Sequence, residues 1–390
     1  MKNRLTGTLV ALGVALSLGT ATAQAEEFVI GSHVPLSGKL ARVGNGMHEG
    51  IRVGIELANK KYAGKHVFKL ETIDDETSPA KAVAAVDKLV AQNVVAFTGG
   101  YGSNIIGPAS EAANKAGKTY ITSGGVAKGL SQRGFKTFFR INNTAGYAKA
   151  MLGLLNDMGV KKVSILYSNK DATTGLAKFV EGKLKESGTE VAMHEFAAST
   201  TDFKPLMNKV KLIDRPDAVA MVGYENDYVG ILRAGSVLKP DVKAMVGVWS
   251  LATSKMNSEF HELVQNVYGT SMLPFPVTFT SPEAIEFSEV YQKLFGKLPD
   301  YLGQFGYVQT RLLSDAIVTA HEAGTLGKGG ISEALRAANS DTLIGRVDFD
   351  ENGDNPYFSH RMGQHQGEKV VVVWPKSAAT GDMNFPATPW

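Results

Sequence analysis

The chain has 390 residues, of which 44% are hydrophobic and 20% charged, and its formal net charge is +3. This composition is typical of globular proteins and excludes disordered, collagen-like and coiled-coil chains. The length predicts two domains, each large enough to bury its own core. Cysteine is absent from the chain, which excludes disulfides, thiolate metal sites, a cysteine nucleophile and a lipidated N-terminal cysteine.

The first 25 residues are organised like a secretory signal peptide. Met1–Arg4 is a short cationic start, and Leu5–Gly19 is apolar but short for a membrane span. Ala23–Ala25 supplies a small-x-small cleavage site before Glu26. A first core helix or an uncleaved anchor is the alternative interpretation. We predict that residues 1–25 are removed and that the mature protein is periplasmic.

The rest of the chain offers no electrostatic or apolar feature for large partners. Loss of Lys2 and Arg4 with the leader lowers the net charge from +3 to +1, and no long basic run remains. We therefore expect neither nucleic-acid binding nor attraction to anionic lipid. No later stretch has 18 consecutive apolar residues, so we expect no stable membrane insertion.

After Glu27, short apolar runs alternate with helical patterns in two successive blocks. The first block predicts strands at 28–34, 67–73, 94–98, 119–122 and 138–142, with helices at 44–61, 79–92 and 104–115. The second block predicts strands at 163–167, 191–196, 218–222 and 244–248, with helices at 174–187, 203–212 and 227–238. Repeated strand–helix–strand units indicate an α/β fold with mostly parallel sheets covered by helices on both faces.

The last third of the chain departs from this alternation. The prolines of 272–276 predict a linker, because each proline disfavours helix in the residue before it. Helices are predicted at Pro282–Phe295 and Tyr307–Ala323, and a hairpin at 358–364 and 369–374 around a turn at Gly367.

Motifs of enzyme chemistry are incomplete in this sequence. Each His-Glu dipeptide lacks the second histidine, four residues on, that a zinc-binding helix needs; the first histidines are His48, His194, His261 and His321. Asp348, Asp350 and Asn352 resemble the front half of a calcium loop, but Ser359 stands where the bidentate glutamate belongs. Nucleophile elbows and phosphate loops are also missing. We therefore predict no catalytic residue, no metal and no cofactor, and a protein that is not an enzyme.

Two glycine- and serine-containing loops are the candidates for binding. Gly99–Ser103 and Thr122–Gly125 each follow a predicted strand and precede a helix. In an open parallel sheet both loops lie at the carboxyl ends of the strands, where ligands bind. Glycine allows close approach of the backbone, and free N–H groups at a helix start suit an anion. The alternative is that both loops are only tight turns.

Short motifs in a fixed order point to a family. They are Pro35–Gly38, Asp74–Asp75, Gly107–Ser110, Tyr120–Ser123 and Leu343–Gly345 with Phe349–Asp354. With this set the mature chain resembles the periplasmic branched-chain amino-acid-binding proteins, the type I solute receptors of ATP-driven importers. The resemblance implies two Rossmann-like lobes joined by a three-stranded hinge that closes on the ligand.

The resemblance also implies where the lobes begin and end. The N-terminal lobe comprises 26–142 and 275–343, and the C-terminal lobe comprises 143–274 and 344–390. The three crossovers are expected near 141–146, 270–276 and 343–346.

The family's ligand-binding positions carry over only in part. Ser103 and Gly124 match positions that hold the ligand carboxylate, and Tyr224 matches a tyrosine that lies over the ligand. Val126 stands in place of the threonine that helps to hold the α-amino group, and Trp249 in place of the acid that pairs with it. Two further aromatic positions of the family are Val43 and Ala172 here.

These departures change the expected ligand. A buried ammonium without its carboxylate would cost several kcal/mol. We therefore expect the ligand to be a small carboxylate. An amino acid is one possibility, and an aromatic or aliphatic acid without an α-amino group is the favoured one. Aromatic side chains would line a pocket for such an acid, although Trp249 could instead be a core or hinge residue. The predicted ligand-binding residues are Tyr101, Ser103, Ser123, Gly124, Val126, Tyr224 and Trp249.

The predicted function is therefore the periplasmic substrate-binding component of an ABC importer. Its partners would be the ligand and the permease and ATPase subunits, and the protein itself is expected to be a monomer. A receptor domain that passes ligand binding to a signalling protein is the alternative, since the fold alone does not separate the two. A secreted hydrolase is disfavoured by the incomplete motifs.

Overall fold

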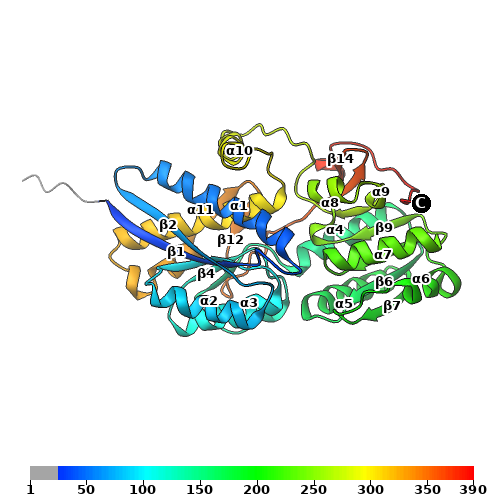
Figure 1. The fold of residues 1–390 in the computed structure, drawn as a ribbon, viewed down its shortest axis with the longest axis horizontal. Coiled ribbons are helices and arrows are strands. Elements are labelled where there is room, and N and C mark those ends of the chain that lie inside the picture. The colour runs from blue at the N-terminus through cyan, green and yellow to red at the C-terminus, as the bar shows by residue number, and fades with distance from the viewer. Residues whose placement is uncertain (1–24) are drawn as a thin grey trace, which may run out of the picture.

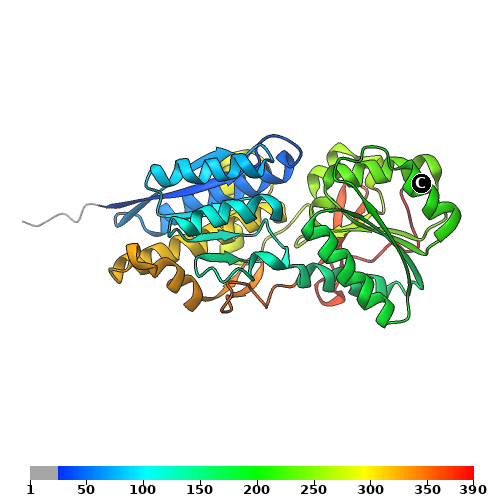
Figure 2. The same ribbon diagram turned by 90° about the horizontal axis from the view of Figure 1, so that it is seen from below.

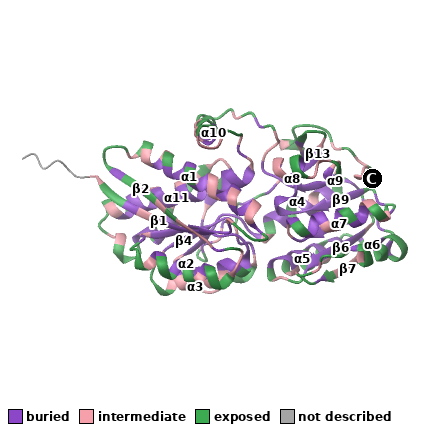
Figure 3. Ribbon diagram, viewed as in Figure 1, coloured by how far each residue is buried: buried purple, intermediate pink, exposed green. Residues whose placement is uncertain are grey.

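A computed structural model describes residues 25–390, so all but the last residue of the predicted signal peptide lies outside the described residues. It consists of two α/β lobes arranged side by side (Figures 1 and 2). Each lobe has a central sheet covered by helices, and the buried residues follow the strands and the inner helix faces (Figure 3). The predicted fold class, two Rossmann-like lobes of the type I periplasmic binding proteins, is confirmed.

The first lobe is built on a five-stranded, fully parallel sheet in the order β2-β1-β3-β4-β5. Its strands are β1 (Glu26–Val34), β2 (His66–Asp74), β3 (Ala96–Gly99), β4 (Tyr120–Thr122) and β5 (Phe138–Arg140). Its helices are α1 (Ala41–Lys61), α2 (Pro79–Ala91), α3 (Ser103–Lys115), α10 (Pro282–Phe295), α11 (Tyr301–Glu322) and α12 (Gly330–Ala337). Helices α1 and α11 lie on one side of the sheet and α2 and α3 on the other (Figure 1).

The second lobe is built on a seven-stranded sheet in the order β14-β13-β10-β9-β8-β6-β7. Its strands are β6 (Lys162–Ser168), β7 (Glu190–Phe196), β8 (Ala218–Val222), β9 (Ala244–Gly247), β10 (Tyr268–Thr270), β13 (Met362–Gln366) and β14 (Lys369–Trp374). Its helices are α4 (Thr144–Asp157), α5 (Asp171–Glu186), α6 (Lys204–Lys209), α7 (Glu225–Leu238), α8 (Ser254–Glu259) and α9 (His261–Val264). The predicted C-terminal hairpin is confirmed as β13 and β14, which pair antiparallel on either side of Gly367.

Helix α11 begins at Tyr301, six residues before the predicted start at Tyr307. The Asp300 carboxylate caps it by accepting hydrogen bonds from the N–H groups of Leu302 and Gly303 (2.9 and 3.4 Å). Glycines in this first part of the helix allow α11 to pack closely on α1. A Cβ at Gly50 of α1, for example, would lie 1.9 Å from the Gly303 carbonyl oxygen.

The chain passes between the two sheets three times: after β5, after β10 and after the small hairpin of β11 (Asn339–Thr342) and β12 (Gly345–Asp348). The expected third crossover, 343–346, lies at the turn of this hairpin and the start of β12, and the hairpin forms a two-stranded sheet of its own. The first and third passages are bonded together, since the Arg140 N–H donates to the Gly353 carbonyl (2.8 Å). The lobe boundaries given above stay a prediction.

The calcium-like motif forms part of this connection. The Asp350 carboxylate accepts hydrogen bonds from the N–H groups of Asn352 (2.8 Å) and Asp354 (2.9 Å), which closes a tight turn. Asp354 in turn binds the buried Arg140 guanidinium through both carboxylate oxygens (2.9 and 2.6 Å). The motif therefore joins two hinge segments. Within residues 25–390, His, Asp and Glu do not gather in groups of three or more suited to a metal.

None of the helices described for residues 25–390 combines the length and apolar character needed to cross a membrane.

Candidate ligand-binding site

The two glycine loops of the first lobe are locked to each other. Gly99, Gly100 and Gly102 have φ values of 111°, 73° and 92°, which disfavour residues with a side chain. The Gly102 N–H donates to the Gly124 carbonyl (2.9 Å). A Cβ at Gly124 would lie 2.0 Å from the Gly100 carbonyl oxygen, so only glycine permits this approach. The carboxyl ends of β3 and β4 thus carry one composite loop structure.

A buried polar network supports the first of these loops from below. His33, Asp75 and Tyr120 are fully buried. Imidazole Nδ1 of His33 lies 2.9 Å from the Asp75 carboxylate, and its Nε2 lies 2.7 Å from the Tyr120 hydroxyl. The Gly100 N–H donates to the His33 carbonyl (2.7 Å). A Cβ at Gly100 would lie 2.5 Å from the Tyr120 hydroxyl. The network therefore fixes the loop that leads to Ser103.

Ser103 is placed to donate a hydrogen bond to a ligand. It is the first residue of α3, and its hydroxyl oxygen accepts hydrogen bonds from the N–H groups of Val126 and Ala127, both at 3.0 Å. A hydroxyl has two acceptor positions and one proton. Both acceptor positions are used here, so the remaining proton is directed to an acceptor such as a carboxylate. Helix α3 has no side-chain N-cap, which leaves its first N–H groups available to the same anion.

The second lobe contributes aromatic rings. Tyr224 and Trp249 follow β8 and β9, and their rings are stacked with centroids 5.5 Å apart and planes 20° apart. Tyr147 of α4 meets Trp249 edge to face, at 6.2 Å. Trp249 has a φ of 52°, a conformation that costs energy for a bulky residue and persists only where the surroundings hold it. One such contact is the Thr270 hydroxyl, which donates to the Trp249 carbonyl (3.2 Å).

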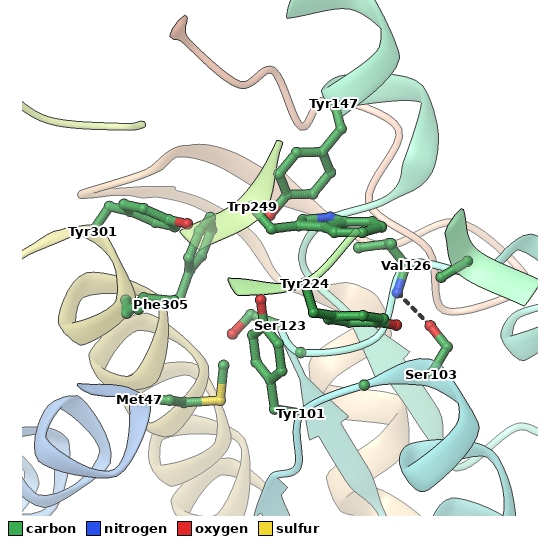
Figure 4. Close-up of a pocket in the computed structure, with 14 residues that line it drawn as sticks. Met47, Tyr101, Ser103, Ser123, Val126, Tyr147, Tyr224, Trp249, Tyr301 and Phe305 are labelled. Atoms are coloured by element: carbon green, nitrogen blue, oxygen red, sulfur yellow. Dashed lines mark hydrogen bonds between the residues drawn. The ribbon is translucent and has the colours of Figure 1, made fainter. Parts of the chain in front are cut away.

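These groups surround one cavity between the lobes (Figure 4). All the predicted binding residues line it: Tyr101, Ser103, Ser123, Gly124, Val126, Tyr224 and Trp249. The remaining lining residues are Met47, Gly102, Tyr147, Ala172, Tyr301, Leu302 and Phe305. Ala172 is one of the family's aromatic positions, whereas Val43, the other, does not line the cavity.

Sequence reasoning did not identify the lining residues contributed by α1, α4 and α11. Tyr301 and Phe305 lie before the predicted start of the helix at Tyr307. Met47 and Tyr147 lie on apolar helix faces and are indistinguishable from core residues by periodicity. The sequence did contain a signal for Tyr301 and Phe305. Asp300 is a typical N-cap residue, and these two aromatic residues follow it on one helix face.

No acidic side chain is among the lining residues. Glu225 and Asp227, the acids next to Tyr224 in sequence, are engaged elsewhere. Asp227 accepts a hydrogen bond from the Tyr224 N–H (2.8 Å) and so caps α7. The cavity thus offers a hydroxyl donor and aromatic rings, but not a counter-charge for a bound ammonium.

Glu225 makes an ion pair between the lobes. Arg42 of α1 lies 2.8 Å from the Glu225 carboxylate of α7 and 2.7 Å from that of Glu259 of α8. Glu225 is only 7% exposed. Burial raises its pKa to about 7, although Arg42 works in the opposite direction and Glu259 adds to the rise. The closed arrangement of the lobes is therefore coupled to the protonation of this carboxyl group.

Two lobes that enclose a cavity at the carboxyl ends of their parallel strands define a solute-binding protein of the hinge-closing type. The sequence pattern of the family described as "Periplasmic binding protein" matches residues 27–368. The chain therefore belongs to the periplasmic binding protein family, and the predicted resemblance to its branched-chain amino-acid-binding members is confirmed by the relatives below.

Among curated relatives, Leu/Ile/Val-binding protein homolog 7 from Brucella melitensis is 26% identical over 398 residues, covering 97% of this chain and 99% of the relative. The leucine-binding protein LivK from Thermotoga maritima has the same fold, with a TM-score of 0.79 and 23% identity over 89% of this chain and 97% of LivK.

A solute-binding protein of an ABC transporter from R. palustris, solved with benzoate, has a TM-score of 0.77 and 16% identity, covering 89% of this chain and 95% of that protein. The protein described here is thus a substrate-binding protein of the branched-chain amino-acid ABC-transporter type.

Proposed function

We propose that this protein captures a small carboxylic acid without an α-amino group, aromatic or branched aliphatic, in the periplasm. It then delivers the acid, as a monomer, to the permease and ATPase subunits of an ABC importer. The proposal is carried by one observation on the described residues that line the cavity. They combine a serine hydroxyl whose proton is free to donate with a set of aromatic rings, and none of them has an acidic side chain.

The carboxylate end of the ligand is assigned to the first lobe. The Ser103 hydroxyl can only donate, and a hydrogen bond to a charged acceptor contributes about 1.5–3 kcal/mol. The N-terminus of α3 adds a favourable electrostatic environment for an anion. An uncharged ligand would leave the Ser103 hydroxyl and the N-terminus of α3 without a negative charge to bind.

The absence of an α-amino group follows from the second lobe. An ammonium next to Val126 and Trp249 would lose its hydration without gaining a hydrogen-bond acceptor or a carboxylate from these side chains. A flat or apolar body, in contrast, packs favourably on the aromatic rings. The R. palustris protein that binds benzoate has this fold, which supports an aromatic acid as the ligand.

A matched pair of ligands tests the proposal. Leucine and 4-methylpentanoate differ only in the α-amino group, and benzoate adds an aromatic acid. Calorimetry and thermal shift should show binding of the two acids and rejection of leucine. A ligand at 100 times its Kd adds about 2.7 kcal/mol of stability, which is easily measured. Tight binding of leucine would contradict the proposal and would require an acid from outside the lining residues.

Export is tested separately. Cleavage after Ala25 gives a mature N-terminus at Glu26, the first residue of β1. Mass spectrometry of the protein from the periplasmic fraction should show this N-terminus, whereas a mass that includes residues 1–25 would contradict the predicted signal peptide.

A further inference from the structure

One hydroxyl in the wall of the cavity has no hydrogen-bond partner among the described residues. Tyr301, the first residue of α11, is buried, and its hydroxyl oxygen makes no hydrogen bond to any of the described residues. Tyr301 lines the cavity and its hydroxyl is directed toward the interior (Figure 4). Buried polar groups are nearly always satisfied in folded proteins, so an unsatisfied one that faces a binding cavity indicates a ligand atom or an ordered water.

Aromatic rings pack around the Tyr301 side chain. Phe305 lies edge to face with the Tyr301 ring at 5.7 Å, and His360 does so at 5.6 Å. Burial lowers the pKa of His360 to about 3, so its imidazole is neutral at physiological pH. Burial raises the pKa of Tyr301 well above its ordinary value, so the phenol keeps its proton. Tyr301 is thus a neutral donor and acceptor in an apolar wall.

Tyr147, from α4 of the second lobe, provides a second free proton at the cavity. Its hydroxyl oxygen accepts a hydrogen bond from the Asn142 side-chain amide (3.0 Å), which leaves its own O–H to donate. Tyr147 also lines the cavity. Two neutral hydroxyls without a cation beside them suit an uncharged oxygen, whereas a second carboxylate would be buried there without a counter-charge.

Tyr301 and Ser103 lie on opposite sides of the stacked Tyr224 and Trp249 rings (Figure 4). A ligand whose carboxylate is bound by Ser103 therefore directs its far end toward Tyr301. On the basis of the proposed function, we propose that the ligand carries a neutral oxygen substituent, a hydroxyl group, at the end opposite its carboxylate, and that Tyr301 is the specificity-determining residue that binds it.

The test compares benzoate with 4-hydroxybenzoate by calorimetry on the mature protein. A site built to bond a ligand hydroxyl discriminates against the analogue that lacks it. We expect 4-hydroxybenzoate to bind about 5- to 100-fold more tightly than benzoate. The Tyr301→Phe substitution removes only the hydroxyl, and the ratio of the two affinities should fall to near one.

Tyr291→Phe is the matched control. The Tyr291 hydroxyl is hydrogen-bonded to Glu49, and neither residue lines the cavity. Loss of this hydroxyl should therefore leave the affinity ratio unchanged. The Tyr301→Phe protein must fold, as judged by circular dichroism. If it does not, the ratio of the two affinities in the wild-type protein and in Tyr147→Phe still tests whether the cavity binds a ligand hydroxyl.

The outcomes separate the two proposals. Equal affinities of the wild-type protein for benzoate and 4-hydroxybenzoate would overturn the assignment of Tyr301 and leave the proposed function intact. Tighter binding of terephthalate, which has a second carboxylate, would also overturn it. Rejection of every acid would overturn the proposed function itself.

Discussion

The two walls of the cavity are built in different ways. In the first lobe the two glycine loops present backbone and hydroxyl groups, and these loops are held by the contact between Gly100 and Gly124 and by the buried His33 network. We call this part of the lining the polar wall; apolar and aromatic side chains of α1 and α11 lie beside it. The second lobe contributes the Tyr224 and Trp249 rings, which stand on separate loops and stack on each other, and we call them the aromatic wall.

The difference assigns separate tasks to the lobes. The polar wall is organised within one lobe, so it is ready for an anion before closure and needs little reorganisation on binding. In the proposed function the aromatic wall binds the body of the ligand from across the cleft. Contacts to both walls exist only when the lobes are together, and a ligand that makes both shifts the equilibrium toward closure. On this proposal the glycine loops of the first lobe select the charge, and the rings of the second lobe select a flat or apolar body.

The largest effect should come from removing the aromatic wall. Trp249→Ala truncates a buried ring, and the loss of such an anchor typically costs about 2–4 kcal/mol, which is roughly 30- to 900-fold in affinity. Calorimetry with the best acid ligand measures the loss. Trp390→Ala is the control, because Trp390 packs near Gly235 of α7 and does not line the cavity. It should lower stability without changing affinity, and an unchanged affinity in Trp249→Ala would reduce Trp249 to a core residue.

A somewhat smaller effect is expected from the polar wall. Ser103→Ala removes one hydrogen bond to a charged group, so affinity should fall roughly 10- to 150-fold. The control is Ser110→Ala in the same helix, whose hydroxyl donates to the Ile106 carbonyl (2.6 Å) and is outside the cavity. Retained affinity in the Ser103 variant would place the carboxylate elsewhere and remove the division of tasks between the lobes.

The smallest effect is a pH dependence of closure. The pKa of Glu225 is about 7 with the lobes together, against an ordinary value of 4.5 for a solvated carboxyl. The closed state therefore binds a proton more tightly, and its stability falls as pH rises from 4.5 through 7. Ligand affinity should decrease between pH 5.5 and 8, by at most about tenfold per pH unit.

Two variants sharpen this measurement. Glu225→Gln cannot titrate and should give a flat profile over the same pH range. Glu259→Gln removes the more exposed partner of Arg42 and should keep most of the slope. A wild-type affinity that is constant from pH 5.5 to 8 would show that Glu225 stays solvated and that the lobes do not bury it on closure.

Some features of this protein could be predicted from the sequence because they depend on neighbouring residues. Alternating apolar runs and helical periodicity predict the two mostly parallel sheets, and their order predicts that the loops at Gly99–Ser103 and Thr122–Gly125 share one edge. The departures at Val126 and Trp249 can also be identified from the sequence. Parts of both loops line the cavity, as do Val126 and Trp249.

Other features were decided only by packing between segments far apart in the chain. The start of α11 was mispredicted because Gly303 disfavours a helix locally, yet its lack of a side chain is what permits contact with Gly50 of α1. That contact brings Tyr301 and Phe305 to the cavity. Helix propensity is a local quantity of at most about 1 kcal/mol for glycine, and the burial of a long helix–helix interface exceeds it. Sequence alone therefore located the loops of the site, and the tertiary structure determined which helices complete it.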